Sequence, residues 1–178
     1  EIVAKAGFEA NIIENHDQPR GASLFIPEED YGFYSLSALA TIIFCERGLP
    51  FLYQGQEIGM SNRQWKYDEF NDLETINQYQ IALKAGMSKE QALEIARHHS
   101  RDNARTPMQW SSEENAGFSK GKPWMPVNEN YKVVNVAEEE KEYGSILNFY
   151  KRLIAFYKSE EYNEILTYGC LLYTSDAA

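Results

Sequence analysis

Short apolar runs alternate with amphipathic stripes along the first third of the chain. The apolar pair Ile12-Ile13 is followed at once by the polar residues Asn15, His16 and Asp17, which predicts a short buried strand that ends at Asn15. Pro19 cannot donate to a strand ladder, so it stops the strand from continuing. The side chains that could carry chemistry therefore stand directly after the end of a strand.

A helix and a second strand follow in the pattern. Apolar residues recur at i, i+3 and i+4 between Phe33 and Arg47, which predicts a buried helix with Gly48 as its closing residue. The apolar run Pro50–Tyr53 is bounded by glycines and predicts a strand buried on both faces. Strand, helix and strand in this order predict a parallel βαβ crossover.

The remaining two thirds of the chain predict helices separated by irregular segments. Ser88 and Gln91 have the spacing of a capping box at the start of one of these helices. The predicted elements are a loop over Ser61–Asn71, helices over Asp72–Ala85, Lys89–His98 and Ser145–Tyr157, an aperiodic segment over Ser111–Val136, and a strand over Ile165–Tyr168.

Composition narrows the class of protein. A hydrophobic content of 43% over 178 residues predicts a globular chain, and the net charge of −10 argues against nucleic acid or an anionic membrane as a partner. The longest apolar run, Leu36–Cys45, is too short to span a bilayer, and no targeting segment opens the chain. Two cysteines and three histidines without ligand spacing predict no metal site and no cofactor, and they fit a reducing cytoplasm.

Two interpretations of the polar stretch after the first strand stay open on these residues alone. In parallel α/β barrels, residues just past the strand ends form the active site, which would make His16 and Asp17 catalytic. The alternative is an Asx-type turn, in which Asn15 and Asp17 satisfy backbone N–H groups and nothing more.

Four segments carry a resemblance to a known family. They are Asn15–Arg20, Gly48–Met60, Ser100–Trp110, and Asn115–Phe118 together with Pro123-Trp124. In this order and at this spacing they resemble the α-amylase family of glycoside hydrolases (family 13), and within it the α-glucosidase and oligo-1,6-glucosidase branch. The resemblance covers Asn11 to Gly169.

The resemblance implies an α/β fold that is the C-terminal portion of a (β/α)8 TIM barrel. Strand seven would end at Asn15 and strand eight would cover Phe51–Gln54, with the first six strands outside this chain. Residues 1–158 would belong to the barrel and residues 159–169 would start a C-terminal β-sandwich domain. We interpret residues 170–178 as a non-native tail, an in-frame translation of a sequencing adapter, and the alternative is a short divergent strand and tail.

The implied activity is that of a retaining, exo-acting α-glucosidase. The family's Asp nucleophile and Glu acid/base would lie outside this chain, and Asp17 matches the third carboxylate, the transition-state stabiliser. His16 and Arg101 match residues that bind the glucose at the cleaved bond, and the carboxylate partner of Arg101 is expected outside the chain. Glu74 matches a position beside the aglycone glucose, or is an ordinary first-turn helix glutamate.

Other polar and aromatic residues are expected to be structural. Asp102 and Arg105 would be structural, because a dense charged run over a barrel mouth must satisfy its own charges, and Glu57 would anchor loops rather than catalyse. None of the three tryptophans, Trp65, Trp110 and Trp124, is assigned to the site. The substrate would be a small oligosaccharide, and the oligomeric state stays open.

The resemblance leaves alternatives within and outside the branch. Trehalose-6-phosphate hydrolase and sucrose isomerase share these motifs, and a non-catalytic barrel relative that uses the fold for partner binding is the alternative from another class. We expect the 178 residues alone to be inactive and not to fold to a stable monomer.

Overall fold

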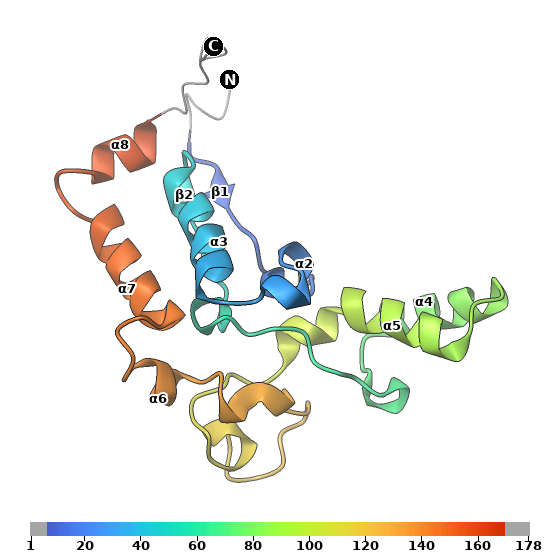
Figure 1. The fold of residues 1–178 in the computed structure, drawn as a ribbon. Coiled ribbons are helices and arrows are strands. Elements are labelled where there is room, and N and C mark those ends of the chain that lie inside the picture. Colours follow the sequence, from blue (N-terminus) through green and yellow to red (C-terminus); the bar gives the residue numbers. More distant parts are fainter. Residues whose placement is uncertain (1–6, 170–178) are drawn as a thin grey trace.

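The computed structural model describes residues 7–169. Strands β1 (Ala10–Asn11) and β2 (Leu49–Pro50) pair in parallel, with Ala10 opposite Leu49 and Asn11 opposite Pro50. Helices α2 (Gly21–Phe25) and α3 (Phe33–Cys45) lie between them in the chain (Figure 1). The predicted parallel βαβ crossover is confirmed.

The strands are shorter and lie earlier in the chain than predicted. The ladder ends at Asn11 and Pro50, so neither the expected strand end at Asn15 nor the expected strand over Phe51–Gln54 is seen. In the described residues each strand pairs only with the other, and the last hydrogen bond of the ladder runs from Phe51 N–H to Asn11 O, at 3.0 Å. Beyond that bond the two segments have no ladder partner, and a strand persists only where its backbone groups are paired.

Gly48 has a different role from the one predicted. Helix α3 ends at Cys45, so Gly48 is not its closing residue. Its φ of 131° lies in the region that favours glycine, and a Cβ there would stand 2.5 Å from the carbonyl oxygen of Glu9, the residue before β1. The glycine therefore lets the two strands approach each other.

Helix α3 packs against α7 (Ile146–Tyr157) and forms the core beside the strands. Figure 1 shows the two helices side by side. The Phe44 ring meets Tyr150 and Tyr157 edge-on, with centroid distances of 6.4 and 5.6 Å. Ser145 caps α7 by accepting the Asn148 N–H, so the helix starts where the sequence predicts it.

Helices α4 (Leu73–Lys84) and α5 (Lys89–His99) form a hairpin that projects from the rest of the chain (Figure 1). The predicted capping box is confirmed: the Gln91 N–H donates to Ser88 Oγ at 3.2 Å, and the Ser88 N–H donates to Gln91 Oε1 at 3.0 Å. The hairpin packs on the buried Trp65 of the preceding loop.

Short helical turns fill the segments between the long helices. The predicted aperiodic region holds only such turns and the start of α6. The remaining elements are 3-10 turns η1 (Glu28–Asp30), η2 (Gln56–Ile58), η3 (Tyr67–Glu69), η4 (Arg101–Arg105), η5 (Glu114–Gly117) and η6 (Glu129–Lys132), and helices α6 (Val136–Glu139) and α8 (Asn163–Tyr168).

The strand predicted over Ile165–Tyr168 is wrong, because these residues belong to helix α8. The Leu166 N–H donates to Tyr162 O at 2.9 Å, which is a helical hydrogen bond. A four-residue apolar run is compatible with either a strand or a helix, so the sequence pattern did not distinguish them. A domain boundary after residue 158 stays a prediction. The tail assigned to residues 170–178 lies outside the described residues.

Within residues 7–169, no helix is both long enough and apolar enough to cross a membrane.

Candidate active site

Asn15 shapes the turn that follows β1. Its Oδ1 accepts the Asp17 N–H at 2.8 Å, and its Nδ2 donates to Gln18 Oε1 at 3.3 Å. This is the Asx turn of the structural interpretation, but the Asp17 carboxylate takes no part in it. The turn leaves the side chains of His16 and Asp17 72% and 53% exposed, with His16 Nε2 3.2 Å from Asp17 Oδ2.

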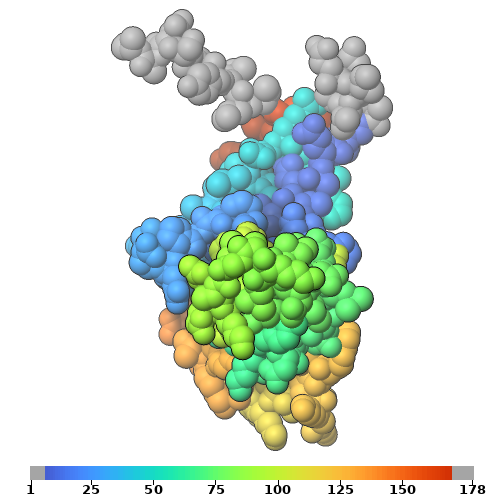
Figure 2. Space-filling view, turned by 90° about the vertical axis from the view of Figure 1, so that its right-hand side faces the viewer, coloured from blue at the N-terminus to red at the C-terminus, as the bar shows by residue number. Residues whose placement is uncertain are grey.

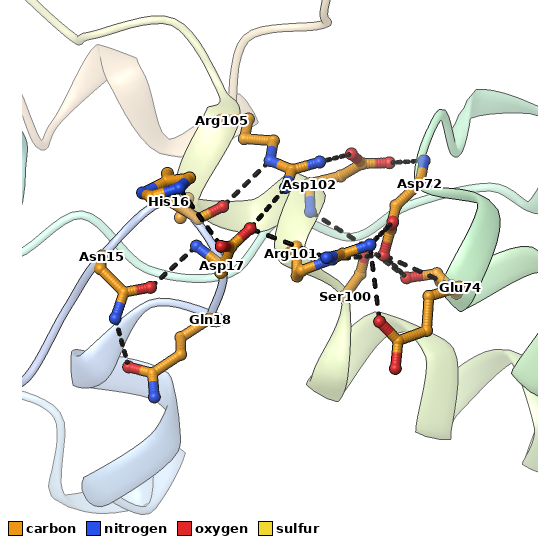
Figure 3. A network of polar contacts seen from close by, with 12 residues as sticks. Asn15, His16, Asp17, Gln18, Asp72, Glu74, Ser100, Arg101, Asp102 and Arg105 are labelled. Atoms are coloured by element: carbon orange, nitrogen blue, oxygen red, sulfur yellow. Dashed lines mark hydrogen bonds and ion pairs between the residues drawn. The ribbon is translucent and has the colours of Figure 1, made fainter.

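Asp17 faces two arginines of η4, as Figure 3 shows. Arg105 Nη2 is 3.0 Å from Asp17 Oδ1, and Arg105 Nε donates to His16 O at 3.0 Å. Arg101 Nη1 is farther from the same carboxylate oxygen, at 3.7 Å. Arg105 thus holds both the carboxylate and the backbone of the turn.

Arg105 was expected to be structural, and its contact with Asp17 was not predicted. The available signal was position: Arg101 and Arg105 stand at the two ends of one five-residue helical turn, so both can face the same neighbour. Asp102, between them, does have the structural role that was predicted. Its buried Oδ2 accepts the N–H groups of Asn71 and Asp72, at 2.7 and 2.9 Å.

Arg101 has a carboxylate partner within this chain that was not predicted, and the partner expected outside the chain stays a prediction. Its Nη2 is 2.5 Å from Asp72 Oδ1 and its Nε is 3.2 Å from Asp72 Oδ2, which is a two-point contact. Burial by itself would raise the pKa of Asp72, but hydrogen bonds from Arg101 and Thr75 outweigh it and hold that pKa below its usual value. The hydrogen bond to Asp72 likewise raises the pKa of Arg101.

Glu74 joins the cluster at its outer edge. Its Oε2 lies 3.5 Å from Arg101 Nη2, and its side chain is largely exposed at the first turn of α4. All four predicted site residues, His16, Asp17, Arg101 and Glu74, therefore meet in one polar network (Figure 3).

Arg20 fixes the turn to the rest of the fold. It is fully buried, with Nη1 3.2 Å from Glu14 Oε2, and it donates to Gln54 O at 2.7 Å and to Asn103 O at 3.2 Å. These bonds join the segment after β1, the segment after β2 and η4. Burial raises the pKa of the Glu14 carboxyl, and the charge of Arg20 opposes that shift.

Glu57 and Trp65 act as loop anchors. Glu57 Oε2 accepts the Gly55 N–H at 2.7 Å, and the indole N–H of the buried Trp65 donates to Asn103 Oδ1 at 2.7 Å. The structural role predicted for Glu57 is confirmed.

The cluster is suited to binding a polyhydroxylated ligand. Asp17 Oδ1 faces the two arginines, whereas Oδ2 faces the exposed His16. A carboxylate accepts hydrogen bonds and an imidazole donates or accepts them, so together they match the hydroxyls of a sugar.

Known proteins that resemble this chain act on sugars, as their names state. Residues 1–169 match the catalytic domain of the alpha-amylase family. An oligo-1,6-glucosidase of Parageobacillus thermoglucosidasius is 40% identical over 165 residues, which are 92% of this chain and 29% of that protein. An alpha-glucosidase of Candida albicans is 42% identical, over 89% of this chain and 29% of that protein.

Solved structures match this chain over a similar share of its length and at similar sequence identity. A trehalose-6-phosphate hydrolase of Bacillus licheniformis superposes with a TM-score of 0.85 at 41% identity, over 93% of this chain and 30% of that one. A trehalulose synthase of Pseudomonas mesoacidophila gives a TM-score of 0.83 at 37% identity, over 95% of this chain and 30% of that one. The chain spans about 29% of the length of the curated relatives, and its fold is a portion of a TIM barrel.

The motifs, the fold and the extent of these matches place the chain in the alpha-amylase family, within its catalytic domain.

Proposed function

We propose that the chain is the part of a retaining, exo-acting α-glucosidase that carries strands seven and eight of the barrel, and that the whole enzyme releases terminal glucose from short α-glucosides. The observation that carries the proposal is the exposed Asp17 carboxylate, held by Arg105 beside His16. Relatives named oligo-1,6-glucosidase, at 40 to 41% identity, support the choice of isomalto- or malto-oligosaccharides as substrates.

Asp17 serves as the transition-state stabiliser in this proposal. As positive charge develops on the sugar ring, the ring hydroxyls become more acidic and bond more strongly to a fixed carboxylate. Because Arg105 and the Asn15 turn fix Asp17 before substrate arrives, little reorganisation is needed during the reaction.

His16, Arg101 and Glu74 bind the substrate. His16 donates to hydroxyls of the glucose that is released. Arg101 is held by Asp72 and presents its remaining N–H groups at the same cluster, and Glu74 lies on the outer side, where the aglycone would bind. The nucleophile and the acid/base would come from other strands of the barrel, outside this chain.

The direct test is a substrate panel on the full-length protein. We expect release of glucose from isomaltose, maltose or p-nitrophenyl α-glucoside, with the α anomer as the first product because the mechanism retains configuration. First release of the β anomer, or no hydrolysis of any α-glucoside, would contradict the proposal.

The second candidate function is that of a trehalose-6-phosphate hydrolase or a sucrose isomerase. It is favoured by the similarity to solved structures of a trehalose-6-phosphate hydrolase and a trehalulose synthase. Trehalose 6-phosphate and sucrose therefore belong on the same panel. A non-catalytic relative would cleave none of these compounds. The cytoplasmic location stays a prediction.

A further inference from the structure

A cavity lies outside the network of His16, Asp17, Arg101 and Glu74, which we call the Asp17 cluster. The cavity has a volume of about 540 Å³ and separates the segment around η3 from the loop that contains η5 and η6. In Figure 2 the green segment that includes η3 lies directly above this yellow and orange loop. The volume falls within the range of small-ligand sites, about 300 to 1,000 Å³. Its lining includes Asp68, Asn71, Glu114, Lys122 and Trp124.

Trp124 supplies an open aromatic surface to this cavity. Its indole is 84% exposed, although Trp is usually packed against other side chains, as Trp65 is here. Pro123 precedes it and Pro126 follows two residues later, and both line the cavity. Proline restricts the backbone, so the segment that carries the indole is stiff. A stiff segment loses less conformational entropy when a ligand binds.

Three charged side chains lie around the indole. Asp68, Glu114 and Lys122 form no ion pair with any other side chain in residues 7–169, whereas the neighbouring Glu69 pairs with Arg63 at 2.7 Å. Carboxylates and an ammonium group around an aromatic face provide acceptors and donors for hydroxyls, with an apolar surface for the ring. This combination fits a pyranose, which has polar edges and a weakly polar face.

The cavity is connected to the Asp17 cluster through one buried carboxylate. Asn71 lines the cavity, and Asp72, the next residue, holds Arg101. Asp102 Oδ2 accepts the N–H groups of both residues, so the cavity wall and the arginine partner share a single anchor. Glu74 lies two residues further along, on the aglycone side of the proposed site.

We propose that this cavity binds the distal glucose units of an α-linked gluco-oligosaccharide, with Trp124 as the stacking platform. The proposal rests on the proposed function, because it extends the aglycone side of the same site. Its consequence is a preference for longer substrates: a disaccharide or an aryl glucoside does not occupy the cavity, whereas an oligosaccharide of sufficient length does.

The test compares a long and a short substrate in the full-length protein. For Trp124→Ala we expect KM for isomaltotetraose to rise about tenfold with kcat unchanged, and both constants for p-nitrophenyl α-glucoside to stay the same. Trp124→Phe, which keeps an aromatic face, should retain most of the wild-type KM. Trp110→Ala is the matched control, because Trp110 is half-exposed and does not line the cavity.

Calorimetric titration with isomaltotetraose, carried out in an Asp17→Asn background so that the ligand is not turned over, separates this proposal from the proposed function. Tetraose binding that weakens about tenfold in Trp124→Ala supports the cavity even if no α-glucoside is hydrolysed. If the protein hydrolyses α-glucosides but Trp124→Ala leaves KM and Kd for the tetraose unchanged, the cavity proposal is overturned. Equal losses for the long and the short substrate would also overturn it.

Discussion

Arg105 contacts Asp17 and the turn that carries it through two different nitrogen atoms. In the full-length protein we expect Arg105→Met to lower kcat/KM by about 10- to 100-fold, the loss expected for charge-assisted hydrogen bonds. Arg105→Lys should recover only part of this loss, because one ammonium group cannot reproduce the planar fork.

Steady-state kinetics with p-nitrophenyl α-glucoside measures this effect. Arg152→Met is the matched control, since Arg152 lies on α7 and contacts Tyr143 instead of the cluster. A kcat/KM for Arg105→Met within twofold of the wild-type value would remove Arg105 from the site.

Glu139 makes stability depend on pH. Burial is the main cause that raises its pKa to about 7, and the charge of Glu57 adds to the shift, although the Leu147 N–H donates to Glu139 Oε2 at 3.0 Å. Between the unfolded pKa near 4.5 and about 7, the folded state binds more protons than the unfolded state. The free energy of unfolding therefore falls as pH rises through this window and levels off above it.

Denaturant titrations of the full-length protein at pH 5 and pH 8 test this prediction. The free energy of unfolding of Glu139→Gln, minus that of wild type, should be larger at pH 8 than at pH 5. The expected difference is on the order of 1 kcal/mol after allowance for solvent screening. Glu138→Gln is the control, because the neighbouring Glu138 side chain is half-exposed and pairs with Lys141 at 2.8 Å. The same pH dependence in Glu139→Gln and wild type would contradict the assignment.

The family resemblance predicted the residues of the cluster, but not all of their contacts. His16, Asp17, Arg101 and Glu74 were found because they match family positions. The Arg101–Asp72 and Arg105–Asp17 pairs were missed, because they join residues 29 and 88 positions apart in the chain. Which charged residues meet over such separations depends on how η4 docks, and Arg20, buried against Asn103 O, contributes to that docking.

Among the elements, helices with an explicit cap were predicted best. Ser88 and Ser145 each accept a backbone N–H three residues later, and the observed helices begin at the next residue. The short strands and α8 were predicted poorly, because a four-residue apolar run does not distinguish a strand from a helical turn. In such runs the available hydrogen-bond partners decide the structure.

Ser88 gives a test at this scale. The α4–α5 hairpin projects from the rest of the chain, so it can open locally without global unfolding (Figure 1). In Ser88→Ala we expect amide hydrogen exchange in α5 to speed up about fivefold, which corresponds to the roughly 1 kcal/mol lost with a cap. Ser112→Ala, whose hydroxyl makes no hydrogen bond in the described residues, should leave exchange in α5 unchanged. Unaltered exchange in Ser88→Ala would mean that the cap contributes nothing.

At the scale of the whole chain, a large apolar surface is left open beside the strands. Phe51 is 53% exposed and Ile12 is 47% exposed, and among the described residues β1 and β2 form a sheet with no third strand. Exposed apolar groups and unpaired strand edges favour association over a stable monomer. The relatives, of which this chain spans about 29%, have far more chain with which to cover such a surface.

We therefore expect the 178 residues alone to aggregate and to release no p-nitrophenol from the α-glucoside. Purification of the chain, followed by circular dichroism with denaturant and by the colorimetric assay, measures both properties. A single cooperative unfolding transition of a monomer, or measurable hydrolysis, would show that this part of the account is wrong.

The most direct test of the central claim is Asp17→Asn in the full-length protein, assayed on isomaltose and on p-nitrophenyl α-glucoside. The variant keeps the shape of the side chain and removes the charge that faces Arg105 and His16. We predict a fall in kcat of about 100-fold or more with a much smaller change in KM, because the carboxylate acts mainly in the transition state. Asp30→Asn, outside the cluster, should behave as wild type, and normal turnover in Asp17→Asn would contradict the account.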